Sequence, residues 1–264
     1  MDNTIDFFWI DYAPPKSGGK VACRFFFPRI NDYIIGRIFS SGTFYEIDLL
    51  EHMFRCLPHR GVYIDVGANI GNHTIFFSKF LAGTVFSIEP HPTNYDLLEY
   101  TVDKNNLNNV VCVRAAAGDK AQQVWLSLPE GFEGNSGSFR VINANTADKL
   151  VPVTMQTLDH LFCRSGLNGQ QVTAIKIDVE GYEVQVLCGA IQILQRNNPH
   201  VFVECKSDRE LEAVSQTLLP LGYRIIGRWC ATPTYHFAPW GLFRHLSWRA
   251  HRKGRHLLRN LGLI

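Results

Sequence analysis

The fold is decided by the stretch Val62-Tyr-Ile-Asp-Val-Gly-Ala-Asn-Ile-Gly71, which is followed by a second apolar run, 84–88, that ends in Glu89. The first run leads into a Gly-x-x-x-Gly turn, and helix-compatible sequence occupies residues 72–81. A strand, a glycine turn, a helix and a second strand closing on an acid are typical of parallel α/β sheets that bind nucleoside-containing cofactors. The sequence therefore predicts such a sheet, with a cofactor site at the glycine turn.

The residues of this turn favour one class of cofactor. A dinucleotide fingerprint has the spacing Gly-x-Gly-x-x-Gly and seats a pyrophosphate on the helix N-terminus. Here Asp65 precedes the turn and no third glycine is in phase, so the turn suits a ligand with an ammonium and a sulfonium better than a pyrophosphate. This favours S-adenosyl-L-methionine over NAD. Gly67 and Gly71 are expected to let the backbone approach the ligand, and Glu89 to accept hydrogen bonds from its ribose hydroxyls.

Strand and helix signals alternate along the middle of the chain. The predicted strands are 62–66, 84–88, 110–114, 122–128, 172–178, 200–204 and 223–227, and the predicted helices are 43–57, 72–81, 93–105, 181–196 and 208–220. Such alternation predicts a mostly parallel sheet with helices on both faces. The polar, glycine-containing segment 129–149 interrupts the pattern and is predicted to be a loop or insertion at the rim of the sheet.

Length and composition are those of one globular α/β domain with additions. The 264 residues are 46% hydrophobic and 19% charged, and no apolar run approaches the ~20 residues that a membrane-spanning helix needs. The first six residues have neither the basic nor the apolar character of a secretory signal. The seven cysteines are scattered without metal-ligand spacing and are predicted to be reduced thiols, as in a cytoplasmic protein.

The net charge of +2 conceals a basic C-terminal segment. Residues 213–264 contain eight Lys and Arg but no Asp or Glu, and most of these cations lie between Arg244 and Arg259. This segment favours peripheral contact with the inner face of an anionic membrane, or with phosphorylated lipid or lipid-linked glycan; a solvated terminal helix is the alternative. Nucleic acid is not favoured as a partner, because the net charge is small and no RNA-binding module is recognised.

Ordered motifs lie between residues 45 and 205, in the blocks 64–71, 89–94, 116–119, 134–137, 153–159, 175–183, 187–190 and 199–204. In this order they resemble the FkbM family of S-adenosylmethionine-dependent methyltransferases. The resemblance implies the class I methyltransferase fold, a Rossmann-like α/β fold whose seven-stranded sheet is mostly parallel with an antiparallel last strand. It also implies O-methylation, often of a sugar hydroxyl or another secondary metabolite. We therefore expect an N-terminal cap at 1–40, a methyltransferase domain at 41–230 and a basic extension at 231–264.

The donor site is predicted from residues around the glycine turn and the second strand. Asn69 in the turn and Asn94 after the second strand join the acids and glycines named above. The family pattern also places an acid near the adenine, and Asp119 occupies that position, with an ordinary turn aspartate as the alternative. The predicted cofactor-binding residues are Asp65, Gly67, Asn69, Gly71, Glu89, Asn94 and Asp119.

Catalysis is predicted at the end of a later strand. Because alternate strand residues share a face, Lys176, Asp178 and Glu180 are expected to point together at the carboxyl edge of the sheet. Glu204, which closes the next strand, is expected beside them. In the functional interpretation, Asp178 or Glu180 accepts the proton of the acceptor hydroxyl, while Lys176 and Glu204 hold the geometry. In the structural interpretation, Lys176 and Glu204 form a buried ion pair and Asp178 only lines the donor pocket.

Other polar residues receive secondary roles. Asn135 and Ser136, in a Gly-Asn-Ser-Gly loop, are predicted to bind a polar acceptor, with a plain surface loop as the alternative. His73 and His91 follow the first and second strands and are reserve candidates for the base. No metal site is predicted, because no histidine or further acid is placed to complete a shell around the acids of the later strands.

The predicted function is an S-adenosylmethionine-dependent O-methyltransferase that acts on a hydroxyl of a sugar, glycan or glycolipid precursor. Two other acceptors stay open: the ribose 2′-hydroxyl of RNA, suggested by the lysine and its neighbouring acids, and a small-molecule secondary metabolite. A protein that binds the donor without chemistry is a further alternative. The glycine turn disfavours an NAD enzyme.

Overall fold

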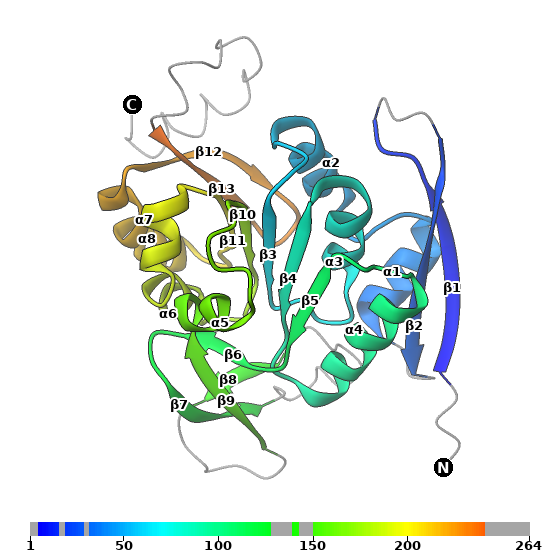
Figure 1. The fold of residues 1–264 in the computed structure, drawn as a ribbon, viewed down its shortest axis with the longest axis horizontal. Coiled ribbons are helices and arrows are strands. Elements are labelled where there is room, and N and C mark those ends of the chain that lie inside the picture. The colour runs from blue at the N-terminus through cyan, green and yellow to red at the C-terminus, as the bar shows by residue number, and fades with distance from the viewer. Residues whose placement is uncertain (1–4, 16–18, 29–31, 128–138, 143–149, 241–264) are drawn as a thin grey trace.

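In the computed structural model of the protein, the described residues are 5–15, 19–28, 32–127, 139–142 and 150–240 (Figure 1). The predicted acceptor residues Asn135 and Ser136 lie outside these ranges, as does the basic segment that begins at Arg244. None of the helices in the described part of the chain is both long and apolar enough to cross a membrane.

Seven strands form a large central sheet. They are β3 (Val62–Val66), β4 (Thr84–Ile88), β5 (Val110–Val113), β10 (Val172–Ile177), β11 (His200–Glu204), β12 (Tyr223–Trp229) and β13 (Thr234–Pro239). Their order is β12-β13-β11-β10-β3-β4-β5. The strands from β11 to β5 are parallel, whereas β13 is antiparallel to both β11 and β12. The predicted fold class, a mostly parallel sheet of seven strands, is thus confirmed.

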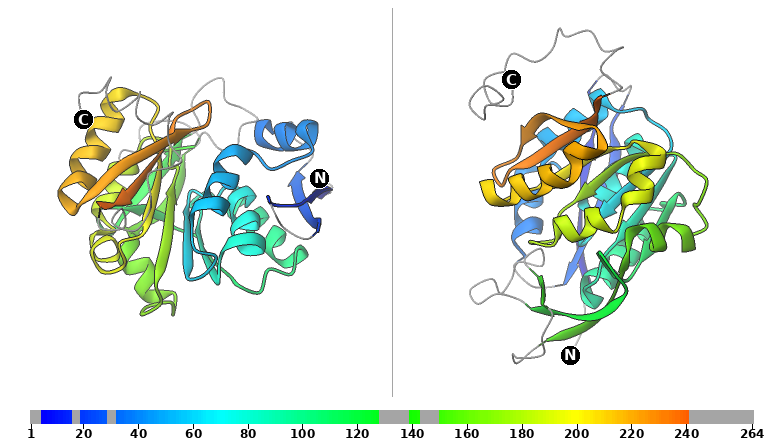
Figure 2. Two further views of the ribbon diagram at one scale, coloured as in Figure 1. Left: turned by 90° about the horizontal axis from the view of Figure 1, so that it is seen from above. Right: turned by 90° about the vertical axis from the view of Figure 1, so that its left-hand side faces the viewer.

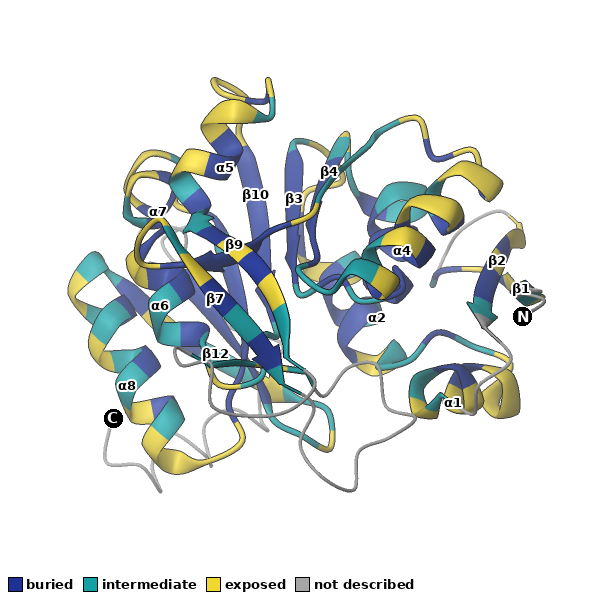
Figure 3. Ribbon diagram, turned by 90° about the horizontal axis from the view of Figure 1, so that it is seen from below, coloured by how far each residue is buried: buried dark blue, intermediate teal, exposed yellow. Residues whose placement is uncertain are grey.

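Helices cover both faces of this sheet (Figure 2). They are α1 (Tyr33–Ser41), α2 (Ile47–Cys56), α3 (Asn72–Phe76) with its π-helical continuation (Phe77–Leu81), α4 (Pro92–Lys104), α5 (Leu158–Arg164), α6 (Glu183–Cys188), α7 (Ile191–Asn197) and α8 (Asp208–Leu218), which a short 3₁₀ turn (Leu219–Leu221) follows. Val62, Ile64 and Val66 share a core with α5–α8, and Tyr63 between them shares a core with α1–α4. The central strands are therefore buried on both faces, as parallel sheets require (Figure 3).

Two smaller sheets flank the large one. The hairpin of β1 (Ile5–Tyr12) and β2 (Val21–Pro28) packs beside α4. Strand β2 is tied to the end of α4 at Arg24. The N–H and C=O of Arg24 both form hydrogen bonds with the side-chain amide of Asn105, at 2.9 and 2.8 Å. The other sheet contains β6 (Ala116–Gly118), β7 (Gln122–Ser127), β8 (Arg140–Ile142) and β9 (Val151–Thr157).

Some predicted elements differ from the structure. The predicted strand 122–128 is real but belongs to the small sheet, because its apolar residues pack against β9 in a separate core. The seventh strand of the large sheet is instead β13, which was not predicted. The predicted helix 181–196 is two helices that meet at Gly189, where an added Cβ would overlap the carbonyl oxygen of Gly118. The helix expected from residue 43 begins only at Ile47, because Glu46 has a left-handed backbone.

A chain of three imidazoles fixes helix α2 against the antiparallel end of the sheet. His52 Nε2 lies 3.0 Å from His236 Nδ1, and His236 Nε2 lies 2.8 Å from His200 Nδ1. The His52 ring also stacks on Trp229, with centroids 3.8 Å apart. Burial lowers the pKa of His200 to about 4, so this ring is neutral at physiological pH. These contacts set the position of the helix whose N-cap is Glu46.

Gly67→Ala is expected to destabilise the fold more than the same change at Gly166. Both glycines have left-handed backbones, with φ of +81° and +79°, but an added Cβ at Gly67 would overlap the carbonyl oxygen of Asp178, whereas Gly166 has nothing within 4 Å. The backbone conformation alone costs about 1–2 kcal/mol, and overpacking at Gly67 adds about 1–3 kcal/mol or more. Urea unfolding of both variants measures the difference, and equal losses would contradict the packing role of Gly67.

Candidate active site

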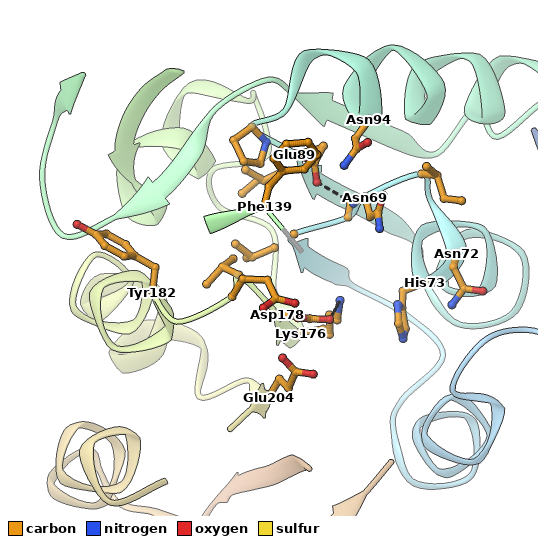
Figure 4. Close-up of a pocket in the computed structure, with 18 of the residues that line it drawn as sticks. Asn69, Asn72, His73, Glu89, Asn94, Phe139, Lys176, Asp178, Tyr182 and Glu204 are labelled. Carbon is orange, nitrogen blue, oxygen red and sulfur yellow. Dashed lines mark hydrogen bonds and ion pairs between the residues drawn. The ribbon is translucent and has the colours of Figure 1, made fainter. Parts of the chain in front are cut away.

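A cavity of about 310 Å³ opens at the carboxyl ends of β3, β4, β10 and β11. Figure 4 shows Glu89 and Phe139 toward one end of this cavity and Glu204 toward the other, with Lys176 and Asp178 between them. The carboxyl edge of a parallel sheet is where open α/β folds bind ligands. Four of the seven predicted donor residues and all four predicted catalytic residues therefore meet at one site, although they come from distant parts of the chain.

The glycine turn and Glu89 form the first part of the site. Glu89 accepts hydrogen bonds from the backbone N–H groups of Asn69 and His91, at 2.8 and 2.9 Å. Burial raises the pKa of Glu89 to about 7, and these two bonds oppose the shift only in part. The side-chain oxygen of Asn69 is buried without a hydrogen-bond partner among the described residues. The site thus presents acceptor atoms that a ligand with N–H or O–H groups can satisfy.

An apolar wall stands next to these polar groups. Ala116, Leu126, Phe139 and Val141 come from the small sheet and the segment beside it, and all of them line the cavity. The Phe139 ring stacks on His91, with centroids 3.9 Å apart. His91 itself does not line the cavity, and burial lowers its pKa. The wall provides an apolar surface for a flat ring system.

The predicted donor residues fall into two groups. Gly67, Asn69, Glu89 and Asn94 line the cavity. Three others do not line it: Asp65, Gly71 and Asp119.

Asp65 lies behind the cavity, where it braces the sheet. Its side chain is fully buried, and one carboxylate oxygen accepts a hydrogen bond from Thr74 Oγ1 at 2.7 Å. The other carboxylate oxygen lies 3.8 Å from Lys176 Nζ, across the β3–β10 pair. From behind the cavity its charge raises the pKa values of both Lys176 and Glu89.

Gly71 and Asp119 also face away from the cavity. Gly71 is the N-cap of α3, with a φ of 97°, and an added Cβ would lie 3.0 Å from Leu98 of α4. It permits close packing of helix on helix, whereas the sequence suggested close approach to a ligand. Asp119 is exposed beyond the end of β6, as its ordinary-turn interpretation predicted.

Lys176 is the central charge of the site. Its ammonium is 4% exposed and lies 3.2 Å from Asp178 Oδ2, in addition to its contact with Asp65. Burial alone would lower the pKa of Lys176, but the carboxylates of Asp178, Asp65 and Glu46 outweigh burial and hold the pKa above its usual value. Burial would likewise raise the pKa of Asp178, yet Lys176 and His73 hold that pKa below its usual value. Both groups are therefore ionised at neutral pH.

A second lysine, Lys206, completes the cluster of acids. Its ammonium contacts Glu180 and lies 3.6 Å from Glu204 Oε2. Burial, reinforced by the charge of Asp178, raises the pKa of Glu204 well above its usual range. Lys206 was not predicted from the sequence, although it follows the end of β11 by only two residues.

Two sequence expectations about this cluster need correction. Strand β10 ends at Ile177, so the shared strand face does not extend to Glu180, which lies in a turn with a φ of 58°. The turn brings it to the cavity all the same. The buried ion pair expected between Lys176 and Glu204 is wrong in its partners, because Lys176 pairs with Asp65 and Asp178.

Three carboxylates in this cluster are close enough to share a cation. Oxygens of Asp178, Glu180 and Glu204 lie within 4.8 Å of one another, and this is the one such group among the described residues. Lys176 and Lys206 already place positive charge beside these oxygens. The absence of a metal stays a prediction.

The far side of the cavity has an acid–histidine pair that the sequence did not single out as a pair. His73 Nε2 lies 3.2 Å from Glu46 Oε2, and the two side chains are 8% and 10% exposed. Tyr45, the residue before Glu46, is held by the side-chain amide of Asn72. Hydrogen bonds of 3.1 Å join this amide to both the N–H and the C=O of Tyr45. Tyr33, on α1, lines the same side.

Comparison with known proteins decides the family. A family model described as the Methyltransferase FkbM domain matches residues 65–225, which is more than half of the chain. The chain belongs to the FkbM methyltransferase family. The resemblance predicted from the ordered motifs is thereby confirmed, and the chain contains a methyltransferase domain.

Two curated relatives are methyltransferases. Methyltransferase 1 of Beauveria bassiana is 24% identical over 147 residues, which are 50% of this chain and 59% of that protein. The hexuronic acid methyltransferase AglP of Haloferax volcanii is 26% identical over 180 residues, which are 66% of this chain and 67% of that protein. The chain thus spans from 59% to 67% of the length of these relatives.

A solved FkbM structure shares the fold. The methyltransferase FkbM from Methylobacillus flagellatus superposes with a TM-score of 0.51 at 18% sequence identity, over 68% of this chain and 44% of that one. At this identity the likeness shows the fold alone.

Lys176→Met is expected to lower the free energy of unfolding by about 3–5 kcal/mol at neutral pH, because it leaves two carboxylates without their buried partner. The deficit should shrink as the pH falls below the ordinary aspartate range. The pKa of Asp178 is lowered in the folded protein, so its stabilising charge is lost as pH falls through that value. Denaturation with urea at several pH values measures both effects.

Lys104→Met is the matched control, because Lys104 is exposed and pairs only at the surface, with Asp103 at 2.8 Å. It should change stability little at any pH. A similar loss in both variants would mean that Lys176 is not the charge that holds the site together.

Proposed function

We propose that this FkbM methyltransferase uses S-adenosyl-L-methionine to methylate a hydroxyl group of a sugar, glycan or glycolipid precursor. The observation that carries the proposal is the single cavity in which the Glu89 end adjoins an apolar wall and the opposite end gathers acids, lysines and a histidine. The first end suits a nucleoside and the second suits a polar acceptor.

The residues present fit the donor. Glu89 has free acceptor capacity for two ribose hydroxyls, and the unpartnered Asn69 oxygen can accept a further hydrogen bond. Phe139 and Leu126 offer apolar surface to an adenine. When bound, the donor supplies a methyl group that its sulfonium sulfur has already activated. The chain must therefore provide alignment and remove the acceptor proton.

Support for a sugar acceptor comes from the chemistry of the far end and from one relative. Glu46, Glu180 and Lys206 present both hydrogen-bond acceptors and donors, and Tyr33 and Tyr45 add aromatic surface, with ring centroids 6.4 Å apart. Such a mixture suits a ring that carries several hydroxyls. AglP is named as a hexuronic acid methyltransferase, which is a sugar-modifying activity.

A direct test uses S-adenosylmethionine labelled on its methyl group. The protein is incubated with separated polysaccharide, glycolipid, RNA and small-molecule fractions from its source and with oligosaccharides that end in glucuronic acid. Label in a carbohydrate or glycolipid supports the proposal. Label in RNA or in a small metabolite would replace it with one of the other two acceptors. Donor binding without any label would favour a protein that binds the donor without chemistry.

Donor affinity is expected to depend on pH through Glu89. Its pKa of about 7 in the free protein means that the carboxyl gains a proton as the pH falls from 8 to 6, and the protonated form is a poorer acceptor for the ribose hydroxyls. Affinity for S-adenosylmethionine should therefore fall by about tenfold over this range.

Glu89→Gln is the matched variant, because it keeps the shape and removes the titration. It should bind the donor more weakly at pH 8 and lose the part of the pH dependence that Glu89 causes. Isothermal titration calorimetry at pH 6, 7 and 8 gives both curves, and the comparison cancels titration of the donor's own amino group. Parallel curves for the two proteins would remove Glu89 from the donor site.

A further inference from the structure

We propose that His73, supported by Glu46, is the general base that takes the proton of the acceptor hydroxyl. This inference rests on the proposed transfer to a hydroxyl group. It assigns the proton to the acid–histidine pair at the far side of the cavity, whereas the sequence favoured Asp178 or Glu180.

The pair places a carboxylate beside one ring nitrogen of the base, as an ion pair without hydrogen-bond geometry. His73 Nε2 lies 3.2 Å from Glu46 Oε2, and both residues line the cavity. With Nε2 against the carboxylate, Nδ1 is the nitrogen that takes the proton. In Figure 4, His73 lies on the side of the cavity opposite Tyr182, with Lys176 and Asp178 between the two. An imidazole whose second nitrogen faces a carboxylate is the usual arrangement of a catalytic histidine.

The position of Glu46 is enforced by its surroundings. Glu46 has a left-handed backbone, with a φ of 57°, which costs a residue other than glycine about 1–3 kcal/mol and persists only where other contacts impose it. The Asn72 amide clamps the backbone of Tyr45, and the imidazole chain that begins at His52 fixes helix α2. Contacts from α3, β13 and β11 therefore hold Glu46, whose backbone is strained, beside His73.

The other acids of the cavity are weaker candidates. Lys176 and His73 hold the pKa of Asp178 below its usual value, so it has little tendency to accept a proton. Burial raises the pKa of Glu204, so this carboxyl already carries a proton near neutral pH. Glu180 is occupied by Lys206. Histidine is the side chain whose ordinary titration range spans neutral pH.

The groups that face the pair come from three directions. Asp178 and Lys176 lie at the end of β10, and their charges act on His73 and Glu46, respectively. The Cys230 thiol, in the turn after β12, and the Tyr45 phenol, just before α2, both feel the charge of Glu46. Burial raises the pKa of each, so both groups are neutral. Asp178 and Glu46 therefore both favour the protonated imidazole that the step produces.

The acceptor O–H gives its proton to His73 Nδ1, and its oxygen lone pair forms the new bond to the methyl carbon. The carbon–sulfur bond breaks, and its electron pair stays on sulfur as the neutral thioether. The carboxylate charge of Glu46, 3.2 Å from Nε2, stabilises the imidazolium, and solvent later removes the proton.

The main test measures turnover against pH with the carbohydrate fraction that takes label from the wild-type protein. We expect His73→Gln to lose about 10²–10⁴-fold in kcat and to lose the acid limb of the profile, with little change in donor affinity. Glu46→Gln should shift that limb to lower pH, because the imidazolium loses its carboxylate. His160→Gln, an exposed histidine on α5, is the matched control and should behave as wild type. Added imidazole should partly restore His73→Ala.

A second measurement needs no acceptor. Diethyl pyrocarbonate carbethoxylates neutral imidazoles that it reaches, so mass spectrometry of the treated protein should find the label on His73 as well as on the exposed His160. Absence of label on His73 in the folded protein would show that its ring is closed to the cavity and would overturn the proposal.

The remaining outcomes separate this inference from the proposed function. An acid limb that survives in His73→Gln but vanishes in Asp178→Asn would assign the base to Asp178. Full turnover in His73→Gln would overturn the role of His73 and leave the O-methyltransferase proposal intact. Failure of wild-type protein to label any hydroxyl-bearing acceptor would overturn both.

Discussion

The site depends on one buried cation. Lys176 is 4% exposed and lies between Asp65 on the adjacent strand and Asp178 at the end of its own strand. A buried ammonium is tolerated only where carboxylates compensate it, so its presence fixes both acids at the carboxyl edge of the sheet. The loop that follows Asp178 then passes so close to Gly67 that no side chain fits there. The charge thus couples the glycine turn at the proposed donor end to the acids at the proposed acceptor end.

Most of the fold could be predicted from the sequence because its signals are local. The runs 62–66, 84–88 and 200–204 are apolar, are bounded by turn residues and form strands at the predicted positions. Strand β13 was missed because it contains Thr234, Tyr235 and His236, and their burial depends on partners elsewhere in the chain, such as the imidazole of His52. Residues 122–128 were predicted as a strand of the large sheet but belong to the small one. A strand signal in the sequence does not indicate which sheet the strand joins.

The site shows the same division between local and distant signals. Asn69 and Glu89 could be predicted because the glycine turn and the end of the next strand meet in every parallel pair of this kind. Asp65 and Gly71 are residue types that often contact ligands. Here, however, the charge of Asp65 is paired with Lys176, and the missing Cβ of Gly71 leaves room for another helix. Glu46 and Lys206 could not be predicted, because each belongs to the site through an ion pair, with His73 and Glu180 respectively. No sequence spacing links the members of either pair.

The distribution of charge in the cavity supports the proposal that one site binds two different molecules. Toward the proposed acceptor end each acid has a basic neighbour: Asp178 has Lys176, Glu180 and Glu204 share Lys206, and Glu46 has His73. Glu89 has no such partner among the described residues and relies on two backbone N–H groups, which is why burial raises its pKa to about 7. A ligand that brings positive charge and hydroxyl donors to this end would supply what the protein leaves out. The neutralised far end suits an uncharged hydroxyl, and that hydroxyl loses its proton only when a base such as His73 lies beside it.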